Sequence, residues 1–254
     1  MSRISDNLQD VHARIAAAAA KVSRDAQEIH LLAVSKMFDA AAVMEAVAAG
    51  QRDFGENYVQ EAIDKIEQVQ KLQNSQTMPD QDGNLMSPRL NWHFIGPVQS
   101  NKTRALAEHF DWVHSVDREK IAQRLAEQRP ANLPPLNVCI QVNIDGEESK
   151  SGVAPQDVAA LAQTIIRLPR LRLRGLMAIP EAAQGMEQQR IPFQALRGLQ
   201  MQLKTQLQTD SQALDTLSMG MSADLEAAIF EGATIVRVGS AIFGQRNKEH
   251  PEEH

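Results

Sequence analysis

Four short polar strings in this sequence each follow an apolar segment, and they contain an amine, an amide, hydroxyls and a guanidinium. The first string ends in Lys36, and the second contains Asn57. The third, SMGMS, is residues 218–222, and the fourth, RVGS, is residues 237–240. In barrels of alternating strands and helices, reactive groups lie where strands end and the following loops begin. We therefore expect these four strings to meet at one end of a barrel.

Lys36 directly follows the apolar segment 29–35 and is the most informative of these residues. An amine that is desolvated and close to other cations has a lowered pKa, and its neutral form attacks aldehydes. Position alone favours an ordinary solvated lysine at a strand end. The anion-binding character of the later strings changes that interpretation to a lysine that forms a Schiff base.

The two glycine-serine strings have the composition of a phosphate site. Gly220 allows close approach of the backbone, and Ser222 can either cap the next helix or donate to a phosphate. Gly239 and Ser240 follow the next apolar segment. The loops after the last two strands of such barrels commonly hold a phosphate. With an amine across the mouth, these strings predict a ligand that carries both an aldehyde and a phosphate.

Arg237 lies between Val236 and Val238 near the end of the last apolar segment. Burying an unpaired guanidinium is prohibitive, so its side chain either pairs with a carboxylate or points at a ligand. The sequence leaves both possibilities open.

Eight short apolar segments alternate with helical ones, which predicts parallel strands joined by right-handed crossovers. No GxGxxG turn follows the first strand, so we predict one closed (β/α)8 barrel over residues 1–244, with an extra amphipathic helix at 5–22. Residues 73–90 are predicted to form a long surface loop, and 245–254 a short charged tail. The expected strands are 29–35, 52–54, 90–95, 112–115, 137–142, 171–177, 213–218 and 234–238.

Composition excludes several classes of function. The net charge of −6 and the isoelectric point near 5.7 argue against a nucleic-acid or anionic-membrane surface. Cys139 is the only cysteine and lies in an apolar run, so we interpret it as an inert core thiol in a reducing compartment. The histidines lack metal-site spacing, and His93 is interpreted as a hydrogen-bonded barrel residue. Without a signal peptide or a membrane span, we expect a cytoplasmic protein.

These strings together resemble the YggS/PROSC family of pyridoxal 5′-phosphate (PLP) homeostasis proteins. The resemblance spans nearly the whole chain, and the string HFIGxxQxNK is its most specific part. It rests on LAVSK at 32–36, FGENYVQE at 54–61, WHFIGPVQSNK at 92–102, GLM at 175–177, LSMGMSAD at 217–224 and VRVGSAIFG at 236–244.

The resemblance implies a monomeric barrel similar to the N-terminal domain of alanine racemase, with PLP bound to Lys36 as a Schiff base. It further implies that the glycine-serine strings hold the phosphate and that Arg237 faces the pyridine nitrogen. A permanently charged partner would keep that nitrogen unprotonated and weaken the ring as an electron sink. The expected cofactor-binding residues are Lys36, Asn57, Ser218, Met219, Gly220, Ser222, Arg237, Gly239 and Ser240.

Two enzymatic alternatives stay open beside a PLP carrier or buffer that supplies apo PLP-dependent enzymes. An amino-acid racemase needs a second base on the other face of the substrate, and Tyr58 is the only tyrosine. A Schiff-base aldolase acting on a sugar phosphate would use the same lysine and cradle without a bound chromophore. We expect the carrier, because a single domain leaves the cofactor face open to water.

Overall fold

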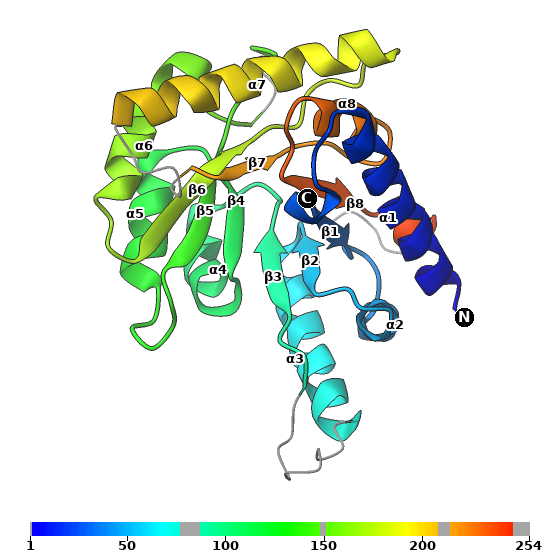
Figure 1. The fold of residues 1–254 in the computed structure, drawn as a ribbon. Coiled ribbons are helices and arrows are strands. Elements are labelled where there is room, and N and C mark those ends of the chain that lie inside the picture. Colours follow the sequence, from blue (N-terminus) through cyan, green and yellow to red (C-terminus); the bar gives the residue numbers. More distant parts are fainter. Residues whose placement is uncertain (1, 77–86, 148–150, 208–213, 246–254) are drawn as a thin grey trace.

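The computed structural model describes residues 2–76, 87–147, 151–207 and 214–245. Eight parallel strands close into a barrel in chain order, with β8 hydrogen-bonded back to β1 (Figure 1). The predicted (β/α)8 barrel is confirmed. The strands are β1 (His30–Val34), β2 (Asp53–Glu56), β3 (Asn91–Phe94), β4 (Trp112–Val116), β5 (Leu136–Gln141), β6 (Leu171–Met177), β7 (Thr216–Ser218) and β8 (Ile235–Val238).

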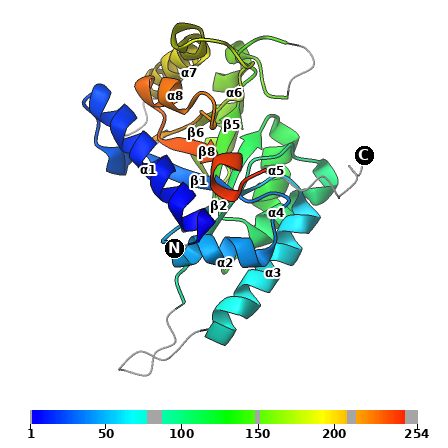
Figure 2. The same ribbon diagram turned by 90° about the vertical axis from the view of Figure 1, so that its right-hand side faces the viewer.

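Helices surround the barrel, and the longest of them, α7, runs across one side (Figures 1 and 2). The α-helices are α1 (Arg3–Lys21), α2 (Ala40–Ala48), α3 (Val59–Gln76), α4 (Thr103–His109), α5 (Glu119–Gln128), α6 (Val158–Ile166), α7 (Met186–Leu207), α8 (Leu225–Phe230) and α9 (Ser240–Phe243). Three single 3-10 turns accompany them, at Ala26–Glu28, Ser100–Lys102 and Pro155–Asp157.

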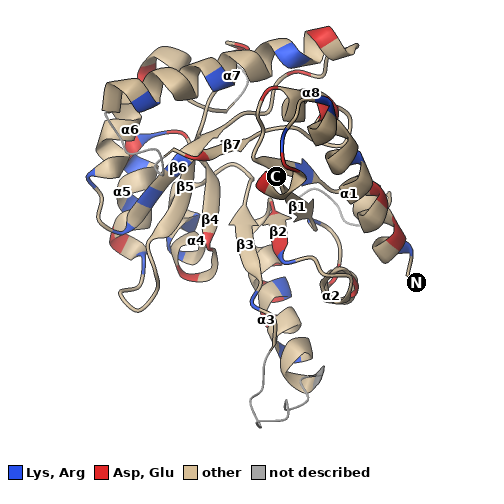
Figure 3. Cartoon of the chain, viewed as in Figure 1, with Lys and Arg blue, Asp and Glu red and all other residues tan. Residues whose placement is uncertain are grey.

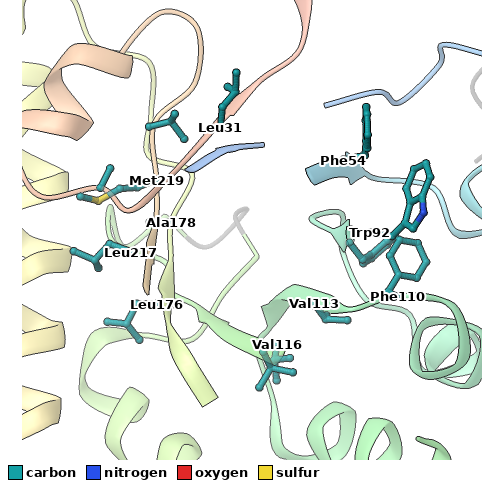
Figure 4. Close-up of a cluster of buried hydrophobic side chains, with 14 of the residues drawn as sticks. Leu31, Phe54, Trp92, Phe110, Val113, Val116, Leu176, Ala178, Leu217 and Met219 are labelled. Atoms are coloured by element: carbon teal, nitrogen blue, oxygen red, sulfur yellow. The ribbon is translucent and has the colours of Figure 1, made fainter. Parts of the chain in front are cut away.

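Most residues of the strands are buried, because each strand faces the barrel interior on one side and the helices on the other. In β1, Leu32 and Val34 point into the barrel, where they pack with Ile95 and Ile235. Leu31 belongs instead to the layer between the strands and the helices. Figure 4 shows part of that outer layer, which includes Phe54, Trp92, Phe110, Val113, Val116, Leu176, Leu217 and Met219.

Helix α1 covers the outside of the barrel beside α2, α8 and α9 (Figure 2). Its apolar residues recur at the predicted helical spacing, and Ile4, Leu8, Val11 and Ile15 are all buried. The hydroxyl of Ser2 caps its first turn by accepting from the backbone N–H of Ser5. The predicted covering helix is therefore confirmed.

Some element boundaries differ from those we predicted. Residues 73–76 continue α3 instead of starting the irregular segment, because their glutamine, asparagine and serine side chains do not end a helix. The spacing of Leu196, Leu199, Leu203 and Leu207 predicts a helix that begins at residue 193, whereas α7 begins seven positions earlier, at Met186. Residues 77–86, the rest of the predicted loop apart from 87–90, lie outside the described residues, as do 246–254 of the predicted tail.

Basic and acidic side chains are interspersed over the outer helices, as Figure 3 shows. Within the described ranges, no helix is both long enough and apolar enough to cross a bilayer.

Closure of the barrel brings the first and last strands together. In the pairing of β1 with β8, Leu32 lies opposite Arg237 and Ala33 opposite Val238. On its other side β1 pairs with β2, where Val34 lies opposite Gly55. The carboxyl ends of these three strands are therefore adjacent.

Candidate functional site at the carboxyl ends of the strands

Lys36 lies in a tight turn that begins where β1 ends. The backbone N–H of Ser35 still bonds to the carbonyl of Gly55 in β2 (3.0 Å), and the N–H of Phe38 then closes the turn on the carbonyl of Ser35 (3.1 Å). Met37 adopts a left-handed conformation with φ of 65°. The side chain of Lys36 is half-buried. The turn therefore ends the strand abruptly and presents Lys36 at the barrel mouth.

A buried cluster of charged side chains fixes the backbone of this turn through hydrogen bonds. Nζ of Lys65 donates to the carbonyl of Ser35 (2.7 Å) and to the carboxylates of Glu56 (2.7 Å) and Glu61 (2.9 Å). The hydroxyl of Ser35 donates to Glu56 (2.7 Å), and the N–H of Met37 donates to Glu61 (2.6 Å). We call Ser35, Glu56, Glu61 and Lys65 the turn clamp.

Burial dominates the electrostatics of the turn clamp. It raises the pKa of Glu56, against the opposing attraction of Lys65. The side chain of Lys65 is only 4% exposed, so its charge is compensated inside the protein by the two carboxylates. The residues on both sides of Lys36 are thus fixed by charge-assisted hydrogen bonds, which are the strong ones.

Arg237 is buried near the end of β8, with 3% of its surface exposed. Its Nη1 donates to the carbonyl (2.6 Å) and the hydroxyl (2.9 Å) of Ser218, and its Nη2 donates to the carbonyl of Ala178 (3.0 Å). Desolvation lowers its pKa to about 10, while Asp224 acts in the opposite direction. At neutral pH the guanidinium is still charged. None of its hydrogen bonds to described residues is to a carboxylate.

The loop after β7 comes close to neighbouring chain segments. Gly220 has φ of +89°, and a Cβ there would lie 2.5 Å from Cβ of Ala228. Its carbonyl accepts from the N–H of Arg237 (3.0 Å), so this loop and β8 are joined directly. Met219 is buried, and its N–H bonds to the carbonyl of Ile235 (3.1 Å). Only glycine allows this conformation and this packing together.

Ser222 does not cap the following helix, so one of its two predicted roles is wrong. The residue at the N-cap of α8 is Asp224, whose carboxylate accepts from the N–H of Met221 (2.6 Å). The helix starts two residues later than predicted, because this Asp224 turn precedes it. Ser222 is half-buried, and its carbonyl accepts from Arg14 of α1 (3.0 Å). The role of phosphate donor stays a prediction.

Gly239 and Ser240 follow β8 and begin the short helix α9. A Cβ at Gly239 would lie 3.1 Å from the carbonyl oxygen of Val34, so this turn packs tightly on the end of β1. The side chain of Ser240 is exposed. Its hydroxyl therefore lies at the same edge of the barrel as the turn that carries Lys36.

Asn57 directly follows β2 and has an unusual side chain. Its Oδ1 is buried and accepts no hydrogen bond from the described residues. Its carbonyl oxygen would lie 2.2 Å from a Cβ at Gly96, so the loop after β3 packs against its backbone. A buried acceptor without a donor is costly. This atom is suited to a donor on a bound ligand.

Ser218 is the last residue of β7, and its predicted phosphate-binding role stays a prediction. Its hydroxyl is fully buried in the barrel interior, where it contacts Nδ1 of His114 (2.8 Å) and accepts from Arg237. Sequence reasoning did not single out His114. Its signal was a histidine beside Ser115 in the middle of a strand that is otherwise formed by tryptophan and valine, since polar residues inside a parallel barrel usually have a partner.

A model of the family described as "Alanine racemase, N-terminal domain" matches residues 7–247. The chain is 57% identical over 251 residues to the pyridoxal phosphate homeostasis protein of Pseudomonas aeruginosa, covering 99% of both chains. It is 51% identical to the protein of that name from Escherichia coli K12, covering 97% of this chain and 98% of that one. The chain belongs to the pyridoxal phosphate homeostasis protein family.

Solved structures agree with this family membership. PipY of Synechococcus elongatus, solved with PLP bound, matches with a TM-score of 0.77 and 35% identity, covering 95% of this chain and all of that one. Alanine racemase from Corynebacterium glutamicum matches with a TM-score of 0.61 at 13% identity, which shows a shared fold only. The predicted resemblance is confirmed.

Proposed function

We propose that this protein binds PLP as a Schiff base between the cofactor aldehyde and Nζ of Lys36, and that it carries or buffers the cofactor. PLP supplies an aldehyde that a lysine amine attacks and a pyridine ring that accepts electrons. The pairing of β1 with both β2 and β8 carries the proposal, because it gathers Lys36, Asn57 and Arg237 at one edge. The PLP-bound relative at 35% identity supports it.

The residues at this edge fit the parts of PLP. The buried Oδ1 of Asn57, which accepts from no described residue, suits a ring hydroxyl. The tight turns at Gly220 and Gly239 bring backbone close to where a phosphate would lie, and Ser222 and Ser240 add hydroxyls. Ser218 and Met219 complete the proposed set of cofactor-binding residues, and they also support Arg237 and the loop after β7.

Arg237 favours holding the cofactor over catalysing with it. A guanidinium donates and does not accept, so beside the pyridine nitrogen it keeps that nitrogen unprotonated. The ring is then a weak electron sink, which limits carbanion chemistry at a bound amino acid. For this reason we propose a carrier in preference to a racemase. A racemase also needs a second base, and Tyr58 is 52% exposed at the start of α3.

Borohydride reduction followed by peptide mapping tests the central claim. The pyridoxyl group is expected on Lys36, and Lys36→Ala is expected to lose the visible absorbance of the PLP-loaded protein. Lys102→Ala is the matched control, since Lys102 follows β3 at the same end of the barrel. Labelling of another lysine, or of none, would contradict the proposal. A colourless protein that traps a sugar phosphate instead would favour the aldolase.

A second experiment separates carrier from enzyme. The PLP-loaded protein is incubated with amino acids in deuterium oxide, and loss of the α-proton signal is followed by NMR. In parallel, its PLP is offered to an apo PLP-dependent enzyme whose activity is recorded. We expect transfer of PLP with slow proton exchange. Exchange at catalytic rates would establish the racemase alternative.

We also propose that the protein acts as a monomer in the cytoplasm. The prediction of a monomer comes from the family resemblance, and that of the cytoplasm includes the single cysteine, Cys139, which we interpreted as a thiol in a reducing compartment. Light scattering coupled to gel filtration measures the first, and cell fractionation the second. A mass of twice 28.1 kDa would contradict the monomer.

A further inference from the structure

A line of polar side chains crosses the interior of the barrel beneath Arg237. Oγ of Ser218, which accepts from Arg237, lies 2.8 Å from Nδ1 of His114. Nε2 of His114 lies 2.9 Å from Nδ1 of His93, and Nε2 of His93 lies 3.3 Å from Oδ1 of Asp53. We call Ser218, His114, His93 and Asp53 the polar column.

The polar column ends at a cavity at the amino-terminal end of the barrel strands, whereas Lys36 lies at their carboxyl-terminal end. Asp53 and Trp112 start their strands, and they line this cavity of about 530 Å³ together with His93. The indole of Trp112 stacks on His93, with ring centroids 5.3 Å apart, and the guanidinium of Arg174 lies 4.6 Å above the indole. One end of the column is thus near solvent, and the other is buried at Arg237.

Hydrogen-bond roles give the column a direction. A guanidinium can only donate, so Ser218 accepts from Arg237. Among the described residues, Nδ1 of His114 is the acceptor within reach of the Ser218 hydroxyl proton. Then Nε2 of His114 carries the hydrogen and donates to Nδ1 of His93. Nε2 of His93 in turn donates to Asp53. Between the guanidinium and the carboxylate, Ser218, His114 and His93 each accept one hydrogen bond and donate one along the column.

The charges at the two ends have opposite sign and match this direction. Burial opposes ionisation of Asp53, but hydrogen bonds from His93 and Asn91 hold its pKa below the usual value. Desolvation, with His93 and Arg237 adding to it, holds the pKa of His114 well below its ordinary value, so the ring is neutral. The other charged or titratable groups at the cavity end are His30, Glu28, Arg24, Arg174 and Asp215.

We propose that His114, His93 and Asp53 are positioning residues that hold the guanidinium of Arg237 toward the cofactor ring through the hydroxyl of Ser218. Arg237 is buried, and among the described residues its acceptors are two backbone carbonyls and one side chain, the hydroxyl of Ser218. The polar column fixes the orientation of that hydroxyl. The expected effect on PLP affinity rests on the proposed function. The direction of the hydrogen bonds along the polar column does not.

The competing arrangement has a doubly protonated His93 that donates to both His114 and Asp53. His114 would then carry its hydrogen on Nδ1 and donate to Ser218, which already accepts from Arg237. The Ser218 hydroxyl proton would have no acceptor among the described residues, and a second cation would lie in the column with Arg237. The two arrangements differ in which nitrogen of His114 is protonated.

Nitrogen-15 NMR of the histidine rings in the PLP-free protein tests the direction of the column. We expect both His114 and His93 to carry hydrogen on Nε2 at neutral pH. In Asp53→Asn, the neutral amide removes the charge that orients His93, so we expect His93 to become a mixture of tautomers. A hydrogen on Nδ1 of His114 in the unaltered protein would overturn the proposal, whether or not PLP binds.

PLP titration and arginine NMR test the positioning role. His114→Phe removes the central link, and we expect the dissociation constant for PLP to rise about tenfold, with about threefold for Asp53→Asn. The Nη–H signals of Arg237 in the PLP-free protein should weaken in both variants. His30→Gln, which lines the same cavity outside the column, should change neither.

Unchanged Nη–H signals in both variants would refute the positioning role, as would unchanged PLP affinity. If the unaltered protein does not bind PLP, the proposed function fails while the NMR readouts still decide the column. If His114→Phe does not fold, Asp53→Asn carries the same test, because it keeps the shape of the side chain.

Discussion

Gly220→Ala is expected to weaken both the fold and the cofactor site. At φ of +89° an alanine pays about 1–2 kcal/mol for its left-handed conformation. Its Cβ would also lie 2.5 Å from Cβ of Ala228 on α8, and overpacking of this kind costs about 1–3 kcal/mol. We therefore expect a loss of about 2–5 kcal/mol in the free energy of unfolding.

Relaxation of the loop would carry the strain into the site. The carbonyl of Gly220 accepts from the N–H of Arg237, so a loop that moves away from Ala228 also pulls on β8. We expect PLP affinity to fall together with stability. Urea unfolding followed by tryptophan fluorescence measures the first quantity, and PLP titration of the folded protein measures the second.

Gly198→Ala is the matched control for this substitution. Gly198 lies within α7, and an added Cβ there would meet no atom within 4 Å. Alanine in a helix interior stabilises by about 0.5–1 kcal/mol relative to glycine. The same change of residue should therefore have opposite effects at the two positions. Equal effects, or an unchanged Gly220→Ala protein, would refute the argument from backbone conformation and packing.

Three further predictions concern buried groups. Burial lowers the pKa of His114, so below about pH 6.5 the folded protein binds fewer protons there than the unfolded chain, and the free energy of unfolding should fall by at most about 1.4 kcal/mol per pH unit. Urea unfolding at pH 7 and 5.5 measures this dependence, and His114→Gln should lose the contribution of His114 to it. Burial raises the pKa of Cys139 to about 12, so a thiol reagent at pH 8 should react only after unfolding, and rapid native reaction would contradict this. Lys65→Met should cost about 3–5 kcal/mol by leaving Glu56 buried without its cation, and adding Glu56→Gln should recover part of the loss.

The barrel could be predicted because its signal is local. Most strands contain a short apolar segment, and a helical segment with its own periodicity follows each of them. In a parallel barrel the residues that directly follow the strands all lie at the same end of the barrel. This is why Lys36 could be predicted to lie near the turn at Gly239. The end of α3 was predicted too early, because nothing in the sequence of residues 73–76 ends a helix.

The direction of individual side chains could not be predicted in the same way. Because both faces of these strands are buried, the sequence does not tell which residues point inward. Ser218 was therefore assigned to the phosphate cradle, although its hydroxyl faces His114, 104 positions away in the chain. The turn clamp was missed for a related reason, since Lys65 lies on α3 and reads as an ordinary charge of a surface helix.

The turn clamp and the polar column perform comparable tasks on opposite sides of the proposed ligand. The turn clamp fixes the backbone on both sides of Lys36 with a buried cation, and the polar column, which ends at the carboxylate of Asp53, orients Arg237 through Ser218. Both rely on charged groups removed from solvent, which cost stability unless their partners are in place. A binding site arranged before the ligand arrives loses less entropy on binding. Such preorganisation favours tight holding of a cofactor, and it accounts for buried charges that the barrel alone does not need.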